Sequence, residues 1–245
     1  MTLPGRSTNE NPSRHHLRTL GIASAAAFLC LLPILSVQSV FSQTPAELAR
    51  FTAEKSLGNP NAPIKMEVFD DYECPTCDEF YENTLKVMID TYVAEGKVYL
   101  IHRDFPIPGH LYSRRAARWV NAAARIGKFE AVERALFDNQ MAWSEYGTEN
   151  PKGVMEPFVK EALTPAEFER VQRLMKGCLV NTQEEIKGCA LDADIQHDVA
   201  LGELIPVNGT PTSIITHRGE RYPPIVGAMS WPLLREFFDQ LLSQK

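Results

Sequence analysis

Cys74 and Cys77 are separated by two residues and carry the strongest chemical signal in the chain. They follow an expected strand over residues 64–69 and open an expected helix whose first residue is Pro75. A thiolate at a helix N-terminus is stabilised by free N–H groups and by the helix dipole, so its pKa falls. Cys77 lies one turn later on the same side of the helix. The pair therefore predicts a site that switches between dithiol and disulfide, with the Cys74 sulfur exposed.

Acidic residues around the pair oppose this effect. Negative charge near a thiol raises its pKa, whereas a lowered pKa of Cys74 would stabilise the reduced state and make the disulfide a stronger oxidant. The two influences have opposite signs, so the sequence leaves the redox potential open. The acidic neighbours are Asp70, Asp71, Glu73, Asp78 and Glu79.

An inert disulfide and half of a zinc site are the other interpretations of the pair. Zinc would need a second pair of Cys or His ligands, and Cys178 and Cys189 are too widely spaced to supply it. We assign no residue to a metal and expect no cofactor. His197 is expected in the core, on an apolar helical face. No catalytic role is assigned to His102, His110, His197 or His217.

The first 42 residues differ from the rest of the chain. Three arginines precede residues 20–41, which carry no charge. A positive flank followed by an apolar run is typical of an export signal, and about 21 residues can also span a membrane. We expect residues 1–42 to be a signal peptide or an N-terminal membrane anchor. The remainder is then exported, either to the periplasm or to another extracytoplasmic location.

In an oxidising compartment, cysteine pairs form disulfides by default. On one continuous helix, Cys178 and Cys189 would lie about 16 Å apart, too far for a bond. Gly177 and Asn181 are expected to break such a helix, so a turn can bring the two residues together. A structural disulfide is favoured, with two separately buried thiols as the alternative.

The overall composition fits one globular domain with room for an insertion. The chain has 245 residues, of which 44% are hydrophobic and 23% charged, and a formal net charge of −6. No run of Lys and Arg exceeds two residues, which argues against a nucleic-acid partner.

Strands and helices are expected to alternate around the cysteines. Residues 43–63 are expected to be a polar approach segment. The alternation over 64–69, a helix from Pro75 and a strand over 98–102 predict a βαβ unit with parallel strands. The helix should bury one apolar stripe, formed by Tyr81, Leu85, Met88, Ile89 and Tyr92.

The rest of the chain is expected to be helical first and then to return to strands. Capping boxes are expected at residues 164–167 and 182–185, and Gly202 should end the helix whose apolar face carries Ala193, His197 and Ala200. A strand over 212–216, a turn at 218–220, a broken strand over 222–226 and a last helix capped by Ser230 follow. This order predicts an α/β fold in which residues 43–108 and 203–245 form one domain and residues 109–202 form an all-helical insertion.

Four motifs, in this order, resemble the DsbA-like thiol–disulfide oxidoreductases. Residues 69–77 are similar to the active-site segment of that family, and the other motifs are residues 103–106, 127–129 and 207–212. The resemblance runs from about residue 55 to the C-terminus. It implies a thioredoxin-like fold interrupted by a helical domain.

The resemblance also implies roles for individual residues. The Thr210–Pro211 bond should be cis and lie opposite the cysteines, where Thr210 can pair with a substrate strand; an ordinary turn is the alternative. The active-site loop, Pro75-Thr76, departs from the family pattern with His after Pro. A cation beside Cys74 is therefore expected to be missing, which argues against strong oxidising power.

Together these features predict an exported oxidase of protein thiols. A substrate thiolate would attack Cys74, Cys77 would leave, and the second substrate thiol would displace Cys74. The expected partners are exported proteins that contain cysteines and, by resemblance, a membrane redox partner that reoxidises the pair. The alternatives are a reductase or isomerase with the same site, and a module that binds metal or peptide through the cysteines.

Overall fold

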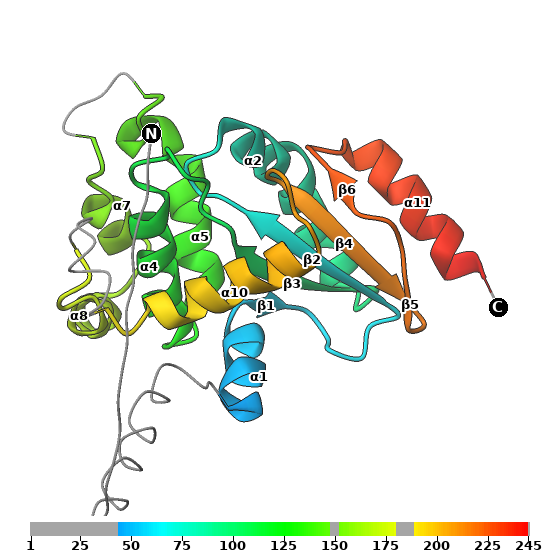
Figure 1. The fold of residues 1–245 in the computed structure, drawn as a ribbon, viewed down its shortest axis with the longest axis horizontal. Coiled ribbons are helices and arrows are strands. Elements are labelled where there is room, and N and C mark those ends of the chain that lie inside the picture. The colour runs from blue at the N-terminus through cyan, green and yellow to red at the C-terminus, as the bar shows by residue number, and fades with distance from the viewer. Residues whose placement is uncertain (1–43, 148–151, 180–188, 245) are drawn as a thin grey trace, which may run out of the picture. The chain divides into compact units, whose positions relative to one another are not determined.

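The computed structural model of the chain describes residues 44–147, 152–179 and 189–244 (Figure 1). Residues 43–245 form one compact unit. The expected signal or anchor at residues 1–42 and the expected capping box at residues 182–185 lie outside the described residues. Within the described ranges, no helix is both long and apolar enough to cross a membrane.

A mixed sheet forms the centre of this unit. Its strands are β1 (Ser56–Leu57), β2 (Ile64–Asp70), β3 (Val98–Asp104), β4 (Thr212–His217), β5 (Glu220–Arg221) and β6 (Ile225–Val226). Their order is β1-β3-β2-β4-β5, and β6 also pairs with β4. The predicted parallel pairing is confirmed for β2 and β3, which run in register from Ile64 opposite Val98 to Asp70 opposite Asp104. All other strand pairs are antiparallel.

The helical run after β2 crosses over one face of the sheet. It consists of α2 (Pro75–Phe80), η1 (Tyr81–Leu85), α3 (Lys86–Met88) and η2 (Ile89–Val93). Every residue of the predicted apolar stripe is buried, so the stripe is confirmed. The sequence did not predict that η1 and η2 are π-helical turns. Gly96, at φ +70°, follows the run and lets the chain turn into β3.

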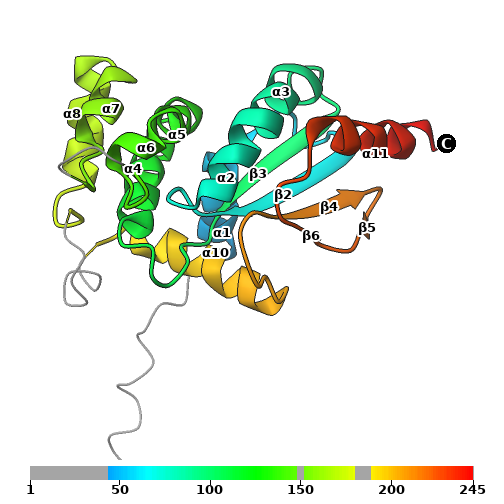
Figure 2. The same cartoon turned by 90° about the horizontal axis from the view of Figure 1, so that it is seen from above.

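Helices cover both faces of the sheet (Figure 2). The other helices that pack against this sheet are α1 (Pro45–Glu54), α10 (Asp192–Leu204) and α11 (Trp231–Ser243). One face lies against the run from α2 to η2 and against α11, and the other lies against α1 and α10. Met66 and Val68 belong to the main core, whereas Phe69 joins a smaller cluster on the opposite face.

The described residues between β3 and α10 form helices only, beside one end of the sheet (Figure 1). They are α4 (Ser113–Ala124), α5 (Phe129–Asp138), α6 (Gln140–Trp143), α7 (Glu156–Glu161) and α8 (Pro165–Leu174). The predicted capping box at the start of α8 is confirmed, with reciprocal bonds between Thr164 and Glu167. The division at 108/109 and 202/203 stays a prediction, and α10 runs across the second boundary.

The expectation for residues 43–63 was wrong, because this stretch contains α1 and β1. Thr44 and Glu47 form a capping box at the start of α1, as Thr164 and Glu167 do at α8. The same four letters, Thr-Pro-Ala-Glu, open both helices. The signal was therefore present at residues 44–47, but the polar composition around it obscured the helix.

The expectation for α10 was also wrong in two respects. Gly202 does not end the helix, which continues to Leu204. The face that packs inward is not the alanine face: Ala200 is exposed and His197 only half-buried, whereas Asp192, Asp194 and Asp198 are buried. Partners from other elements hold these carboxylates in the interior, so tertiary contacts override the apolar pattern. They are Arg118 for Asp192, Arg125 for Asp194, and Lys55 with Arg103 for Asp198.

The C-terminal strands follow the prediction in part. Arg218 and Gly219 both have positive φ, at 53° and 81°, which suits a two-residue hairpin turn between β4 and β5. Of the broken strand predicted over 222–226, only β6 is a strand, and β5 begins at Glu220, where the turn was expected. Ser230 is the residue before α11, but its side chain makes no capping hydrogen bond, so that detail of the prediction was wrong.

Gly202→Ala should destabilise the protein although alanine normally favours a helix by about 1 kcal/mol. A Cβ at this position would lie 2.6 Å from Cε2 of Phe105, so we expect the free energy of unfolding to fall by about 1–3 kcal/mol. Gly209→Ala is the matched control, because its Cβ would meet nothing within 4 Å. Urea unfolding measures both, and a stabilised Gly202→Ala variant would contradict this packing.

Candidate active site

Cys74 and Cys77 lie at the start of α2, where the sequence predicts them. Cys74 is the N-cap in extended conformation, and Pro75 is the first helical residue. The carbonyl of Cys74 accepts the N–H groups of Cys77 and Asp78, at 3.0 and 3.1 Å, which starts the helix. Both sulfurs are free thiols. The expected exposure was wrong: Cys74 is 7% exposed and Cys77 is fully buried, while Pro75 and Thr76 face solvent.

The two thiols have opposite acidities. Hydrogen bonding from the Cys77 thiol, then from the Thr210 side chain and the amides of Cys77 and Thr76, lowers the pKa of Cys74 to about 5, against the effect of burial. Burial raises the pKa of Cys77 well above its ordinary value, and its bond to Cys74 and the negative charge of Asp70 raise it further. Cys74 makes no regular capping hydrogen bond. The neighbouring thiol therefore contributes more than the helix amides on which the sequence argument relied.

The segment before β4 closes the site from the other side. The Thr210–Pro211 bond is cis, as the family resemblance predicts. The Cys74 thiol lies 3.7 Å from the carbonyl oxygen of Thr210. The buried Thr210 hydroxyl has no partner within regular hydrogen-bond geometry among the described residues, and it lowers the pKa of Cys74 as a weak donor. Residues separated by more than 130 positions in sequence therefore meet at the Cys74 sulfur.

The acidic residues before Cys74 anchor the loop. Glu73 is fully buried, and its carboxylate accepts the N–H groups of Tyr112, Ser113 and Glu145 at 2.7, 3.0 and 2.9 Å. A carboxylate at the N-terminus of α4 is also favoured by the helix dipole. None of the acidic neighbours is a main influence on the pKa of Cys74. The balance that the sequence left open is therefore decided by the hydrogen bonds to Cys74, which lower its pKa.

Gln140 also supports the loop, and the sequence analysis did not identify it. This buried side chain of α6 donates to the carbonyls of Tyr72 and Cys74, at 2.9 and 3.1 Å. Only the packing of α6 against the loop reveals the role, because nothing in the local sequence marks this glutamine.

His110 lies near the site, in the loop between β3 and α4. Its Nδ1 lies 2.8 Å from Oδ2 of Asp71, and its ring meets Tyr146 edge-on at 5.6 Å. The hydrogen bond to Asp71 raises the pKa of His110, and the negative charges of Asp71, Cys74 and Glu73 act in the same direction. His110 thus contacts the acidic loop before Cys74, and the expected absence of a cation beside Cys74 stays a prediction.

Asp70, the last residue of β2, is buried beneath the cysteines. Its Oδ1 accepts the N–H of Asp71 at 2.8 Å, and its Oδ2 has no regular partner among the described residues. Burial raises its pKa to about 6, although the charge of His102 and the Cys77 thiol, as a donor, lower it. A carboxyl group that titrates near neutral pH therefore adjoins the less acidic thiol.

The other two cysteines are bonded to each other. The Cys178–Cys189 disulfide joins the chain after α8 to the start of the segment that leads into α10. Both residues are buried. Beside them, the guanidinium of Arg118 binds Asp192 and the carbonyl of Cys178. The disulfide links the chain after the end of α8 to the chain before the start of α10, and the ion pair links α10 to α4.

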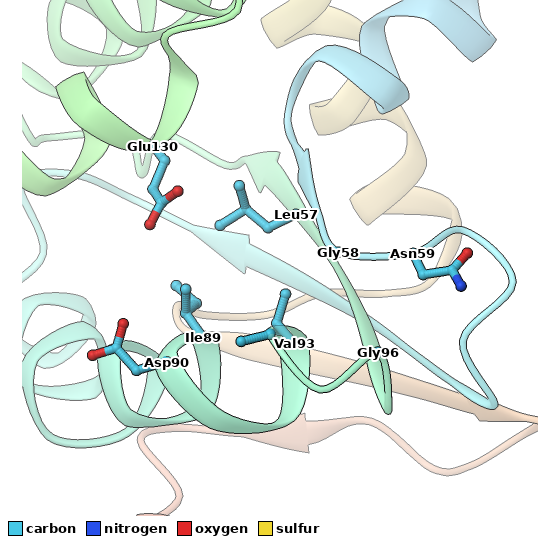
Figure 3. Close-up of a pocket in the computed structure, with 9 residues that line it drawn as sticks. Leu57, Gly58, Asn59, Ile89, Asp90, Val93, Gly96 and Glu130 are labelled. Carbon is cyan, nitrogen blue, oxygen red and sulfur yellow. The ribbon is translucent and has the colours of Figure 1, made fainter.

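Other features of the described residues lack comparable chemistry. A pocket of about 670 Å³ is lined by the side chains of Asp90, Glu130 and apolar neighbours (Figure 3). Neither cysteine lines it. In the described ranges, no group of three or more His, Cys, Asp or Glu side chains is arranged to hold a metal ion.

Comparison with known proteins agrees with this fold. The sequence model of the family described as Thioredoxin matches residues 52–223, which is more than half of the chain. The chain belongs to this family, and its thioredoxin-like fold with helices inserted between β3 and β4 is of the DsbA type. The predicted fold class is therefore confirmed.

Individual relatives and solved structures also indicate the DsbA type. "Probable disulfide bond formation protein D" of Bacillus anthracis is 29% identical over 99 residues, which cover 40% of this chain and 46% of the relative. The match thus spans less than half of that relative. A variant of alpha-DsbA1 from Wolbachia pipientis superimposes with a TM-score of 0.59 at 20% identity, covering 76% of this chain and 89% of the other. DsbA2 of Pseudomonas aeruginosa gives 0.56 at 22% identity, covering 77% and 93%.

The Cys74 thiol should titrate near pH 5 when the pair is reduced. Thr210→Val removes one hydroxyl donor, so we expect the midpoint to rise by about one unit. Thr216→Val, on β4 away from the cysteines, is the matched control. Ultraviolet absorbance of the thiolate measures the midpoint, and a value near that of free cysteine in the wild type would refute this description.

Asp70→Asn should change stability in a way that depends on pH. Because burial raises the pKa of Asp70 to about 6, its contribution to stability is full below pH 4 and is lost as the pH rises through 6. Asparagine stays neutral, so we expect the reduced variant to gain roughly 2 kcal/mol over the wild type between pH 4 and pH 8. Denaturant unfolding at both values measures this, and a difference independent of pH would count against it.

Proposed function

We propose that this protein is a thiol–disulfide oxidoreductase that oxidises cysteine pairs in exported proteins through Cys74 and Cys77. The observation that carries the proposal is the contrast between the two thiols: the pKa of Cys74 is lowered to about 5 and that of Cys77 is raised. A thiolate of low pKa is a good leaving group, and its stability favours the reduced state of the pair. Both properties favour the oxidase direction.

The reaction would begin from the Cys74–Cys77 disulfide. A substrate thiolate attacks Sγ of Cys74, the bond between the two cysteines breaks, and Cys77 leaves. The raised pKa of Cys77 means that it takes up a proton, and the Asp70 carboxyl is next to it. The second substrate thiolate then attacks the substrate sulfur of the mixed disulfide, and Cys74 leaves as a stabilised thiolate. Two electrons pass to the protein, and the substrate gains one disulfide.

Substrate binding is proposed for the segment of Thr210 and Pro211. The Thr210 carbonyl lies 3.7 Å from the Cys74 sulfur, so an extended peptide paired with Thr210 would bring its own sulfur to Cys74. Pro75 and Thr76 face solvent beside the sulfurs and would form the wall that a substrate meets first.

Export and reoxidation are also part of the proposal. The apolar run at residues 20–41 supports an extracytoplasmic location, as a cleaved signal or as an anchor. A membrane redox partner would return the pair to the disulfide. In this scheme residues 43–108 and 203–245 carry the exchange site, the helical insertion of residues 109–202 supports it, and Cys178 and Cys189 form a structural disulfide.

Cys77→Ala should trap the intermediate. Without the second thiol, the mixed disulfide between Cys74 and a peptide with one reactive disulfide cannot be resolved, so it should accumulate and be visible by mass spectrometry. Cys74→Ala should form none. A protein in which Cys178 and Cys189 are both alanine is the control, and it should keep the exchange if its fold persists. Attachment at a residue other than Cys74 would refute the proposal.

The direction of exchange needs a separate measurement. Equilibration of the wild type with glutathione buffers gives the reduction potential. A value near the thioredoxin range, about −270 mV, would favour the reductase or isomerase alternative. Stoichiometric zinc or copper in protein purified under reducing conditions, lost in Cys74→Ser, would instead favour a metal-binding module.

A further inference from the structure

A buried histidine that the exchange mechanism does not use lies on the same face of the sheet as Asp70. The register places Asp70 of β2 opposite Asp104 of β3. His102 is two residues before Asp104, so its side chain emerges on that same face. His102 is 3% exposed, and its ring stacks on Tyr72, in the loop before Cys74, with centroids 5.0 Å apart.

Carboxylates lie beside both nitrogens of this imidazole, but only Nδ1 is within hydrogen-bond distance of one. Nδ1 lies 3.1 Å from Oε1 of Glu133, and Nε2 lies 3.6 Å from Oδ1 of Asp104. Glu133 is itself buried and comes from α5, in the helical segment. The negative charges of both carboxylates favour the protonated imidazole. Against burial, the interactions with Asp104 and Glu133 raise the pKa of His102 to about 10.

We propose that Glu133 and His102 form a positioning pair through which the helical segment places a permanent positive charge beside the Asp70–Cys77 side of the exchange site. The pair touches neither sulfur nor substrate and acts through Asp70. The effect of this pair on the reaction rests on the proposed function. The charge of His102 and its influence on Asp70 can be measured without it.

The charges around His102 come from every element packed against it. Glu133 lies on α5, Asp104 on β3 and Asp70 on β2, while Lys55, before β1, reaches Asp104 at 2.5 Å. The positive charge of His102 lowers the pKa of Asp70 more than the negative charge of Glu133 raises it. Loss of both charges together should therefore raise the pKa of Asp70, although the net charge of the cluster does not change.

The first measurement needs no variant. NMR of the His102 ring in the wild-type protein should show both nitrogens protonated at pH 7 and at pH 8. Glu133→Gln removes one carboxylate, so the His102 midpoint should fall. A neutral His102 at pH 7 in the wild type would overturn the proposal, whether or not any variant folds.

The second measurement follows the Asp70 carboxyl carbon in the reduced protein. His102→Gln with Glu133→Gln replaces the ion pair by two neutral side chains, and the Asp70 midpoint should rise from about 6 by half a unit or more. Glu130→Gln, on the same helix but facing the separate pocket in Figure 3, is the matched control and should leave that midpoint in place. A midpoint in the folded double variant that is unchanged or lower would overturn the proposal.

A third readout connects the pair to the reaction. The pH profile for resolution of a mixed disulfide on Cys74 by Cys77 should shift in the double variant in the same direction as the Asp70 midpoint. If no mixed disulfide forms at Cys74 in any protein, the proposed function fails, while the titrations of His102 and Asp70 still decide whether the positioning pair exists.

Discussion

Three carboxyl groups are buried at and just after the end of β2, and the surrounding structure has to supply hydrogen-bond donors for them. Asp70, Asp71 and Glu73 are each at most 1% exposed, directly before Cys74. An isolated carboxylate in such a place costs several kcal/mol, so it must either find donors or stay protonated. Asp71 and Glu73 find donors in the chain around residues 107–113 and in the amide of Glu145. Asp70 lacks enough donors, and its pKa rises.

This requirement explains why the cysteine loop and the helical segment form one structure. The donors for Glu73 are at the first turn of α4, and those for the carbonyls of Tyr72 and Cys74 come from Gln140 on α6. A loop that carried apolar residues at these positions could pack against almost any helix. With buried carboxylates it requires one arrangement of amides, because hydrogen bonds are directional. The position of the Cys74 sulfur therefore depends on contacts made far from it in sequence.

The two sulfurs differ because their surroundings differ. Cys74 lies at the boundary between the protein and solvent, where the Cys77 thiol, the Thr210 side chain and two amides act as donors to its thiolate. Cys77 lies one turn deeper, is fully buried, and faces the Asp70 side of the cluster. The same residue type thus acquires a low pKa at one position and a high pKa three residues later.

The sequence by itself determined the position of Cys74 and Pro75 at a helix start, the parallel strands on either side, the hairpin after β4 and the α/β class. These depend on short-range spacing, which is readable in one stretch of chain. It did not reveal the role of Gln140, the contact of His110 with Asp71 or the inward face of α10, where three aspartates replace the expected alanines. Each of these depends on a partner many residues away, such as Asp71 for His110 or Arg118 for Asp192. Whether a buried charge is tolerated is decided by what packs against it, and only the tertiary structure supplies that partner.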